Sequence, residues 1–158
     1  MKTIYLAGPI SGENIDNAHT HFLQRVHDLR AQCVIAGSFF STILNPMSGV
    51  EKILGTGGEA KPSGYTDAVS CDQAILRRDR WMVSQADIVL VDLSYCARPS
   101  LGTMAEMAWA YDQKHTLVVV GGLEPGGYMD HAFVKQCGDI FFDTYEEAEA
   151  FVAQTIKN

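Results

Sequence analysis

The residues with the clearest chemical potential lie between Ser100 and Glu106. Ser100 stands at an N-cap-like position before an Ala- and Met-rich segment, Gly102 lets a ligand approach the backbone closely, and Thr103 follows it. Free N–H groups at a helix start favour a bound anion. Glu106 falls on the same helix face as Gly102 and Thr103, and its Cα–Cβ bond tilts back toward the helix start. The pattern predicts an anion cradle with one carboxylate beneath it.

A simpler interpretation of Glu106 is an exposed acid near a helix start, where the helix dipole favours it. The residues in front of the cradle bear on this choice. Residues 88–93 form a short, continuous, β-branched run that is typical of a buried parallel strand. Strand, loop and helix therefore follow one another here.

A second loop at the carboxyl end of a strand follows residues 3–7, which are predicted as the first strand. The carboxyl end of a strand is where open α/β sheets bind ligands. The turn is not GxGxxG, so the dinucleotide fingerprint is absent. A third glycine-rich loop, 121–127, follows a predicted strand at 116–120, and we expect the three loops to form one site. The turn after the first strand consists of Gly8, Pro9, Ile10, Ser11 and Gly12.

Asp79 is the second acid of interest, in a predicted helix over residues 71–85. Arginines flank it at positions 77, 78 and 80, a pattern that is usual on a solvated helix face but also fits an acid entering the cleft. The apolar side chains that we expect this helix to bury are Ile75, Leu76, Trp81 and Met82.

Composition excludes several classes of function. The chain has 158 residues, 47% of them hydrophobic, and a net charge of −7, which argues against a nucleic-acid groove. Its four cysteines are scattered without a CxxC pair, and the spacing of His19, His21 and His27 suits surface positions better than a metal site. We expect no metal, no cofactor and no membrane segment, and a cytoplasmic location.

The order of elements predicts the fold. Strands are expected at 3–7, within 34–44, and at 88–93, 116–120 and 139–142, with helices from Asp16 or Asn17, at 71–85, 100–113 and 145–156, and a short one at 128–135. This alternation predicts one α/β domain over residues 1–158, a doubly wound, Rossmann-like, five-stranded parallel sheet with helices on both faces. The glycine-rich segment 47–70, which contains Tyr65, is predicted to be a mobile lid.

In three of its segments the chain resembles the nucleoside 2-deoxyribosyltransferase superfamily, which includes nucleoside 5'-monophosphate N-glycosidases. The opening IYLAGP at 4–9 is similar to the family's first strand and turn. Asp79 followed by QADIVLV at 85–91 is similar to its aspartate helix and central strand. The pattern Ser-x-Gly-Thr-x-x-Glu at 100–106 is similar to its motif.

The resemblance implies cleavage of an N-glycosidic bond. Glu106 would be the nucleophile at C1', or would stabilise an oxocarbenium-like transition state. Tyr5 would hold Glu106 by a hydrogen bond, and Asp79 would protonate the leaving base, which needs a raised pKa.

The residue at position 100 bears on the substrate. Deoxyribosyltransferases usually have an aspartate there, whereas the monophosphate glycosidases have a serine, which can donate a hydrogen bond to phosphate. Ser100 therefore favours a phosphorylated substrate, with Arg98 as a charge-assisted contact. The first glycine loop departs from the glycosidase pattern, because Pro9 and Ser11 stand where serine and arginine are frequent.

Three alternatives remain. The enzyme could exchange bases on deoxyribose instead of transferring the sugar to water. A phosphoribohydrolase of the cytokinin-activating type also uses Gly-Thr-x-x-Glu, but it has a paired glycine upstream that Pro99 and Ser100 do not supply. A nucleotide-binding module would need no acid beneath the sugar. The resemblance also implies a homodimer or higher homo-oligomer, with residues 129–133 completing a neighbour's site.

Overall fold

The computed structural model describes residues 2–10, 15–38, 42–47, 68, 71–94, 100–121 and 130–156, which form one α/β fold around a single parallel sheet. The strands are β1 (Thr3–Ala7), β2 (Thr42–Leu44), β3 (Ile88–Asp92), β4 (Thr116–Val120) and β5 (Ile140–Phe142). The helices are α1 (Ile15–Ile35), α2 (Asp72–Gln85), α3 (Leu101–Asp112), α4 (Ala132–Cys137) and α5 (Tyr145–Thr155).

The strand order is β2-β1-β3-β4-β5, and every neighbouring pair is parallel. The crossover helix α1 leads from β1 toward one edge, and α3 leads from β3 toward the other. Adjacent strands whose connections leave in opposite directions form a topological switch point, and ligands of open α/β sheets bind outside it. In this fold the switch point lies between the carboxyl ends of β1 and β3.

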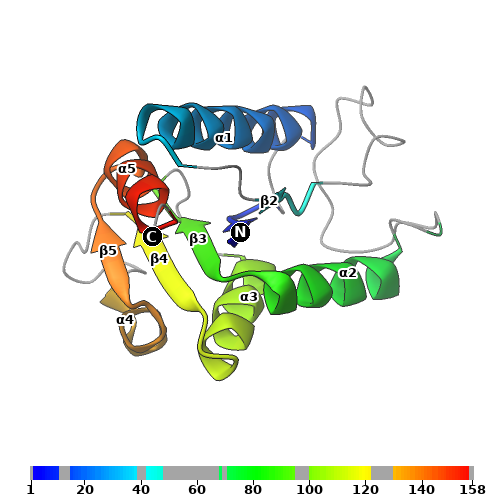
Figure 1. Cartoon of the computed structure of the whole chain (residues 1–158). Coiled ribbons are helices and arrows are strands. Elements are labelled where there is room, and N and C mark those ends of the chain that lie inside the picture. The colour runs from blue at the N-terminus through cyan, green and yellow to red at the C-terminus, as the bar shows by residue number, and fades with distance from the viewer. Residues whose placement is uncertain are drawn as a thin grey trace.

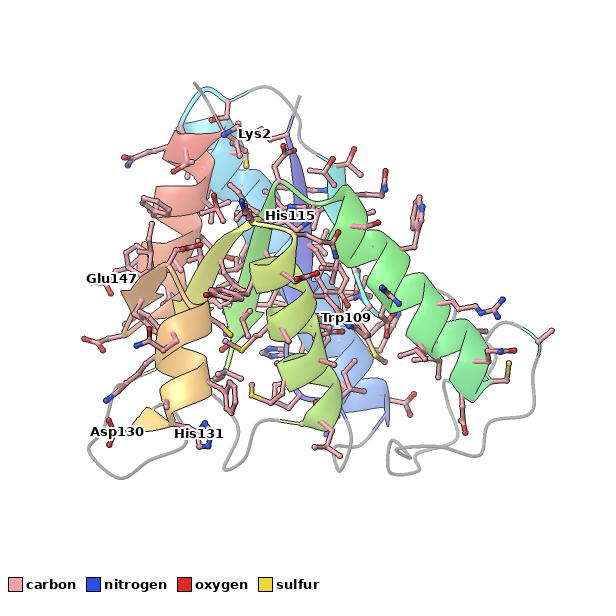
Figure 2. All side chains as sticks on the ribbon, turned by 90° about the horizontal axis from the view of Figure 1, so that it is seen from below. Lys2, Trp109, His115, Asp130, His131 and Glu147 are labelled. Atoms are coloured by element: carbon pink, nitrogen blue, oxygen red, sulfur yellow. The ribbon has the colours of Figure 1, made fainter. Side chains whose placement is uncertain are left out.

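Helices cover both faces of the sheet (Figure 1). Alternation along β1 sends Ile4 and Leu6 to the face of α1 and α5, and Tyr5 to the opposite face. On that opposite face α2, α3 and α4 lie side by side across the sheet (Figure 2). The expected fold class is confirmed.

The strand expected within residues 34–44 is present as β2, although Val34 itself belongs to α1, which continues to Ile35. The expected cap of the first helix was wrong. Helix α1 starts at Ile15, so Asp16 lies in its first turn and is not its cap.

The face of helix α2 that packs on the sheet is only partly the one expected. Leu76 and Trp81 are exposed, at 54% and 58%. Met82 is buried as expected and Val83 is buried with it, because both lie on the side of α2 that also carries Ile75 and Asp79, at spacings of three and four residues.

Candidate active site

A hydrogen bond between β1 and α3 forms the centre of the candidate site. Tyr5 Oη donates to Oε1 of Glu106 over 2.6 Å, and both side chains are buried. The contact expected between these two residues is therefore present. Glu106 is 6% exposed, which excludes the interpretation as a solvated acid near the start of the helix.

The environment of Glu106 favours its neutral form. Burial raises the pKa of the Glu106 carboxyl, the Tyr5 hydrogen bond lowers it, and the nearby charge of Asp79 raises it, which together bring this pKa to about 8. Burial and the charge of Glu106 also raise the pKa of Tyr5 well above its usual value, so Tyr5 remains a hydrogen-bond donor at neutral pH.

Asp79 joins this pair from α2. Its charge raises the pKa of both Tyr5 and Glu106, so the three expected catalytic side chains lie close together. Burial raises the pKa of the Asp79 carboxyl, while the charge of Arg78 and its hydrogen bond lower it. Arg78 Nε lies 3.1 Å from Asp79 Oδ1. Asp79 is thus not a solvated surface acid.

The expected anion cradle is the N-terminus of α3. Ser100 is its N-cap, and its Oγ accepts from the backbone N–H of Thr103 at 3.1 Å. The two hydroxyls lie 2.8 Å apart, and either can be the donor. Because each hydroxyl carries one hydrogen and they share one bond, one O–H remains for another acceptor. The N–H groups of Leu101 and Gly102 have no acceptor within the helix.

The turn after β1 is described only in part. Gly8 is buried directly after the strand, and Ile10 is half-buried against the core on the α1 side. Ser11, Gly12 and Arg98 lie outside the described residues, as do Tyr65 and nearly all of the predicted lid. The roles assigned to all these residues stay predictions.

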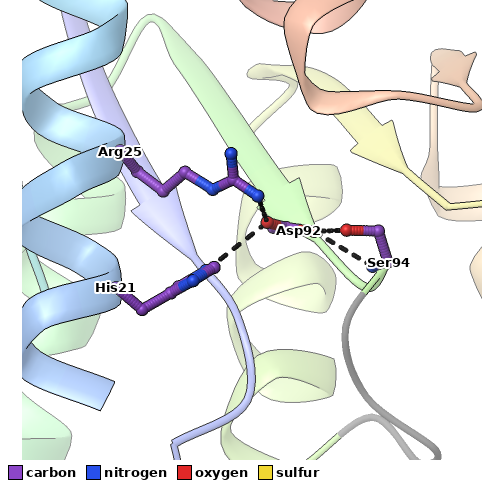
Figure 3. A network of polar contacts seen from close by, with 4 residues as sticks. All are labelled: His21, Arg25, Asp92 and Ser94. Carbon is purple, nitrogen blue, oxygen red and sulfur yellow. Dashed lines mark hydrogen bonds and ion pairs between the residues drawn. The ribbon is translucent and has the colours of Figure 1, made fainter. Parts of the chain in front are cut away.

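An ion-pair network at the end of β3 was not expected. Asp92 Oδ2 lies 3.0 Å from Arg25 Nη2 and 3.5 Å from His21 Nε2, both on α1 (Figure 3). Asp92 Oδ1 accepts from the backbone N–H and the hydroxyl of Ser94, at 3.0 and 2.5 Å. Burial raises the pKa of Asp92, but these hydrogen bonds and Arg25 outweigh it and lower the pKa overall.

This network lies on the α1 face of the sheet, opposite Tyr5, at the same strand ends. The Arg25 guanidinium stacks on the Tyr145 ring at 3.7 Å, which ties α1 to α5. His21 is therefore a half-buried partner of Asp92 and not the surface histidine that we expected. The sequence did show that Asp92 is an acid at the end of an apolar strand, at the edge of the sheet where ligands bind. Its partners on α1 were not predictable from the sequence.

The family follows from comparison with known proteins. A family model described as nucleoside 2-deoxyribosyltransferase matches residues 4–132. The chain belongs to this family. No curated protein matches the sequence.

Solved structures share the fold of this nucleoside 2-deoxyribosyltransferase family member. A conserved protein from Enterococcus faecalis V583 has 16% identity and a TM-score of 0.64, with 98% of this chain and 99% of that one covered. A 2-desoxiribosyltransferase from Leishmania mexicana has 20% identity and a TM-score of 0.57, with 98% of both chains covered. A CMP N-glycosidase from Clostridium botulinum has 12% identity and a TM-score of 0.52, with 96% and 98% covered.

The remaining expectations concern a membrane segment, a metal site and an oligomer. Within the described ranges no helix is both long and apolar enough to cross a membrane. Among those same residues no cluster of three or more His, Cys, Asp or Glu could hold a metal ion. Of the segment expected to reach a neighbouring subunit, residues 130–133 are described, and Phe133 is 74% exposed. A homo-oligomer stays a prediction.

Proposed function

We propose that this protein cleaves the N-glycosidic bond of a ribo- or deoxyribonucleoside 5'-monophosphate and releases the free base. The observation that carries the proposal is the buried hydrogen bond from Tyr5 to Glu106. A buried carboxyl held within two turns of the start of α3 is suited to meet the positive charge that develops at C1'. Membership of the family supports the reaction class.

Glu106 acts as the nucleophile. One carboxylate oxygen bonds to C1' while the N-glycosidic bond breaks and its electron pair moves to the base nitrogen. Water then cleaves the glycosyl ester, which frees the sugar phosphate and restores Glu106. Tyr5 keeps the carboxylate oriented through Oε1, so that Oε2 is the oxygen available for attack.

Asp79 supplies the proton that the leaving base needs. Burial raises the pKa values of both Asp79 and Glu106, and the charge of Asp79 further disfavours ionisation of Glu106. Two such acids hold one proton between them over a range of neutral pH, and their titration belongs to the pair. Because the proton favours Glu106, the reactive form is the less populated one, with this proton on Asp79 and the negative charge on Glu106.

The start of α3 binds the 5'-phosphate. The backbone N–H groups of Leu101 and Gly102 and the remaining hydroxyl hydrogen of the Ser100–Thr103 pair are donors for phosphate oxygens. Phosphate is favoured over a free 5'-hydroxyl because Ser100 adds no negative charge at this point.

Transfer of deoxyribose to a second base is the alternative reaction. It uses the same glycosyl intermediate, and the family name favours it. The two reactions differ only in whether water or a second base attacks the intermediate.

A panel of ribo- and deoxyribonucleosides and their 5'-monophosphates tests the proposal, each with and without a second free base. Base released from monophosphates alone, and abolished by E106A, is the expected result. Exchange that requires a second base would establish the transferase instead. Ligand binding without any turnover would overturn the enzymatic proposal and favour a nucleotide-binding module.

A further inference from the structure

Arg78 makes two directed contacts that connect α2 to the turn after β2. Its Nε donates to Asp79 Oδ1 at 3.1 Å, and its Nη2 donates to the backbone carbonyl of Pro46 at 3.0 Å. The Arg78 side chain is 20% exposed and that of Asp79 is 15% exposed. The guanidinium therefore bridges the expected acid and a separate segment of the chain.

The turn that receives this bridge is itself well packed. Pro46 and Met47 are buried, and the backbone N–H of Met47 donates to Asn45 Oδ1 at 2.9 Å. A contact with a packed turn restrains the guanidinium, and the restrained guanidinium in turn restrains the Asp79 carboxyl. The neighbouring arginines at 77 and 80 are exposed. Only Arg78 among these three lies against the acid in the described structure.

We propose that Arg78 is a positioning residue, which fixes the Asp79 carboxyl so that its second oxygen delivers the proton to the leaving base. This inference rests on the proposed function. Because Oδ1 is occupied by Arg78 Nε–H, the proton resides on Oδ2. A carboxyl held at one oxygen presents the other in a defined direction, which general-acid catalysis requires.

The planar guanidinium is needed for this arrangement. Arginine can donate through Nε to the acid and through Nη2 to Pro46 at the same time, whereas the single ammonium of lysine retains the charge but not the fork. Nη1 is buried and has no partner among the described residues. The positive charge of Arg78 also acts on Tyr5, so its influence extends to the third member of the site.

The test compares two leaving groups in the full-length protein. Variants R78Q and R78K are measured with a purine or pyrimidine monophosphate and with 4-nitrophenyl 2-deoxyriboside 5'-phosphate, whose leaving group needs no proton. The matched controls are R77Q and R80Q, which remove the same charge from exposed neighbours on α2. Thermal unfolding establishes that each variant is folded, and R78K carries the comparison should R78Q fail to fold.

We expect R78Q to lower kcat with the natural base by about 100-fold and to change KM by less than about threefold, since general acids contribute about that factor or more. With the nitrophenyl substrate the loss should be below about threefold. R78K should lose kcat in the same selective manner, because it lacks the fork. In R78Q alone the acid limb of the pH profile should move to higher pH, since the charge that opposes protonation of Asp79 is gone.

Equal losses on both leaving groups, or unchanged kcat in R78Q and R78K, would overturn the role of Arg78 while leaving the proposed function intact. A comparable selective loss in R77Q or R80Q would also overturn it. A wild-type protein that cleaves neither substrate would refute the proposed function itself, and the role of Arg78 with it.

Discussion

Tyr5 and Glu106 stand 101 positions apart in the sequence, and a hydrogen bond of 2.6 Å joins their side chains in the interior of the protein. The first belongs to β1 and the second to α3, so this contact exists only in the folded protein. Burial around the pair makes the Glu106 carboxyl hold its proton up to a pH of about 8. A buried acid that ionises reluctantly has consequences for both stability and rate.

The first prediction concerns stability and E106Q. The Glu106 carboxyl has a pKa of 4.5 in its ordinary state and about 8 in the fold. Between these values the folded state binds more protons than the unfolded state, so this residue makes stability fall as pH rises, and the loss is complete above pH 8. Glutamine carries no such charge but still accepts from Tyr5. E106Q should be more stable than wild type at pH 8, on the order of a few kcal/mol, and equal to it near pH 4.

Urea unfolding at several pH values measures this difference, and E149Q provides the control. Burial and the neighbouring charges, first among them Asp28, raise the pKa of Glu149 on α5 to about 7. The stability of E149Q relative to wild type should therefore also increase as pH rises. Glu149 lies on the opposite face of the sheet, and E149Q should keep wild-type turnover while E106Q loses it. Identical pH dependence in E106Q and wild type would contradict the burial argument.

The second prediction concerns the pH dependence of turnover and Y5F. Above pH 8 the Asp79–Glu106 pair loses its last proton, and at low pH both carboxyls are protonated, so the rate should follow a bell with its alkaline limb near pH 8. The Tyr5 hydrogen bond lowers the pKa of Glu106. Y5F should therefore move the alkaline limb to higher pH.

Y5F should also lower kcat at pH 7 by about 10- to 100-fold, because a hydrogen bond to a charged group contributes about 1.5–3 kcal/mol. The measurement is a set of kcat values from pH 5 to 10 for both proteins. An alkaline limb at the same pH in Y5F and wild type would show that Tyr5 does not act through Glu106.

The residue types of the site were predictable from the sequence, and their surroundings were not. Glu106 was identified by a short motif, and Asp79 by its position between arginines ahead of the central strand, whereas the role of Tyr5 was implied only by the family resemblance. The exposure of Leu76 and Trp81 was not predictable in this way, because hydrophobicity alone does not decide which side of an amphipathic helix meets the sheet.

The network of Asp92 illustrates the same limit. Its partners Arg25 and Ser94 come from α1 and from the start of the next loop, and only the packing of α1 across the end of β3 brings them together. The fork of Arg78 is a similar case, since Pro46 follows a strand that the sequence did not delimit. Contacts between distant segments require the tertiary structure.

The third prediction concerns G102A. Among the described residues, a Cβ on Gly102 would meet Ser100 Oγ alone, at 3.7 Å, which is an ordinary contact. Alanine is also the better helix former by roughly 0.5–1 kcal/mol. The variant should therefore fold at least as stably as wild type. It should raise KM for a monophosphate by about tenfold or more, because the methyl group crowds an anion bound at the helix start. Thermal unfolding and steady-state kinetics together test this; unchanged KM would remove Gly102 from the binding site.

The last prediction concerns S100D, which separates capping from phosphate binding. Aspartate caps helices as well as serine does, so the bond to the Thr103 N–H and the stability of α3 should survive the change. The added negative charge should repel a 5'-phosphate, and kcat/KM for monophosphates should fall by about 100-fold, which corresponds to about 2.7 kcal/mol. Unphosphorylated nucleosides should lose less than about threefold.

The control for this comparison is T144D, because Thr144 caps α5 by the same kind of bond, to the N–H of Glu147 at 3.3 Å. It introduces the same charge at a helix start on the other face of the sheet and should leave both substrates unaffected. Kinetics with paired nucleosides and monophosphates at several salt concentrations would complete the test, since a repulsion between charges weakens as salt increases. Equal losses on both substrates in S100D would mean that Ser100 supports the fold of the site and does not bind phosphate.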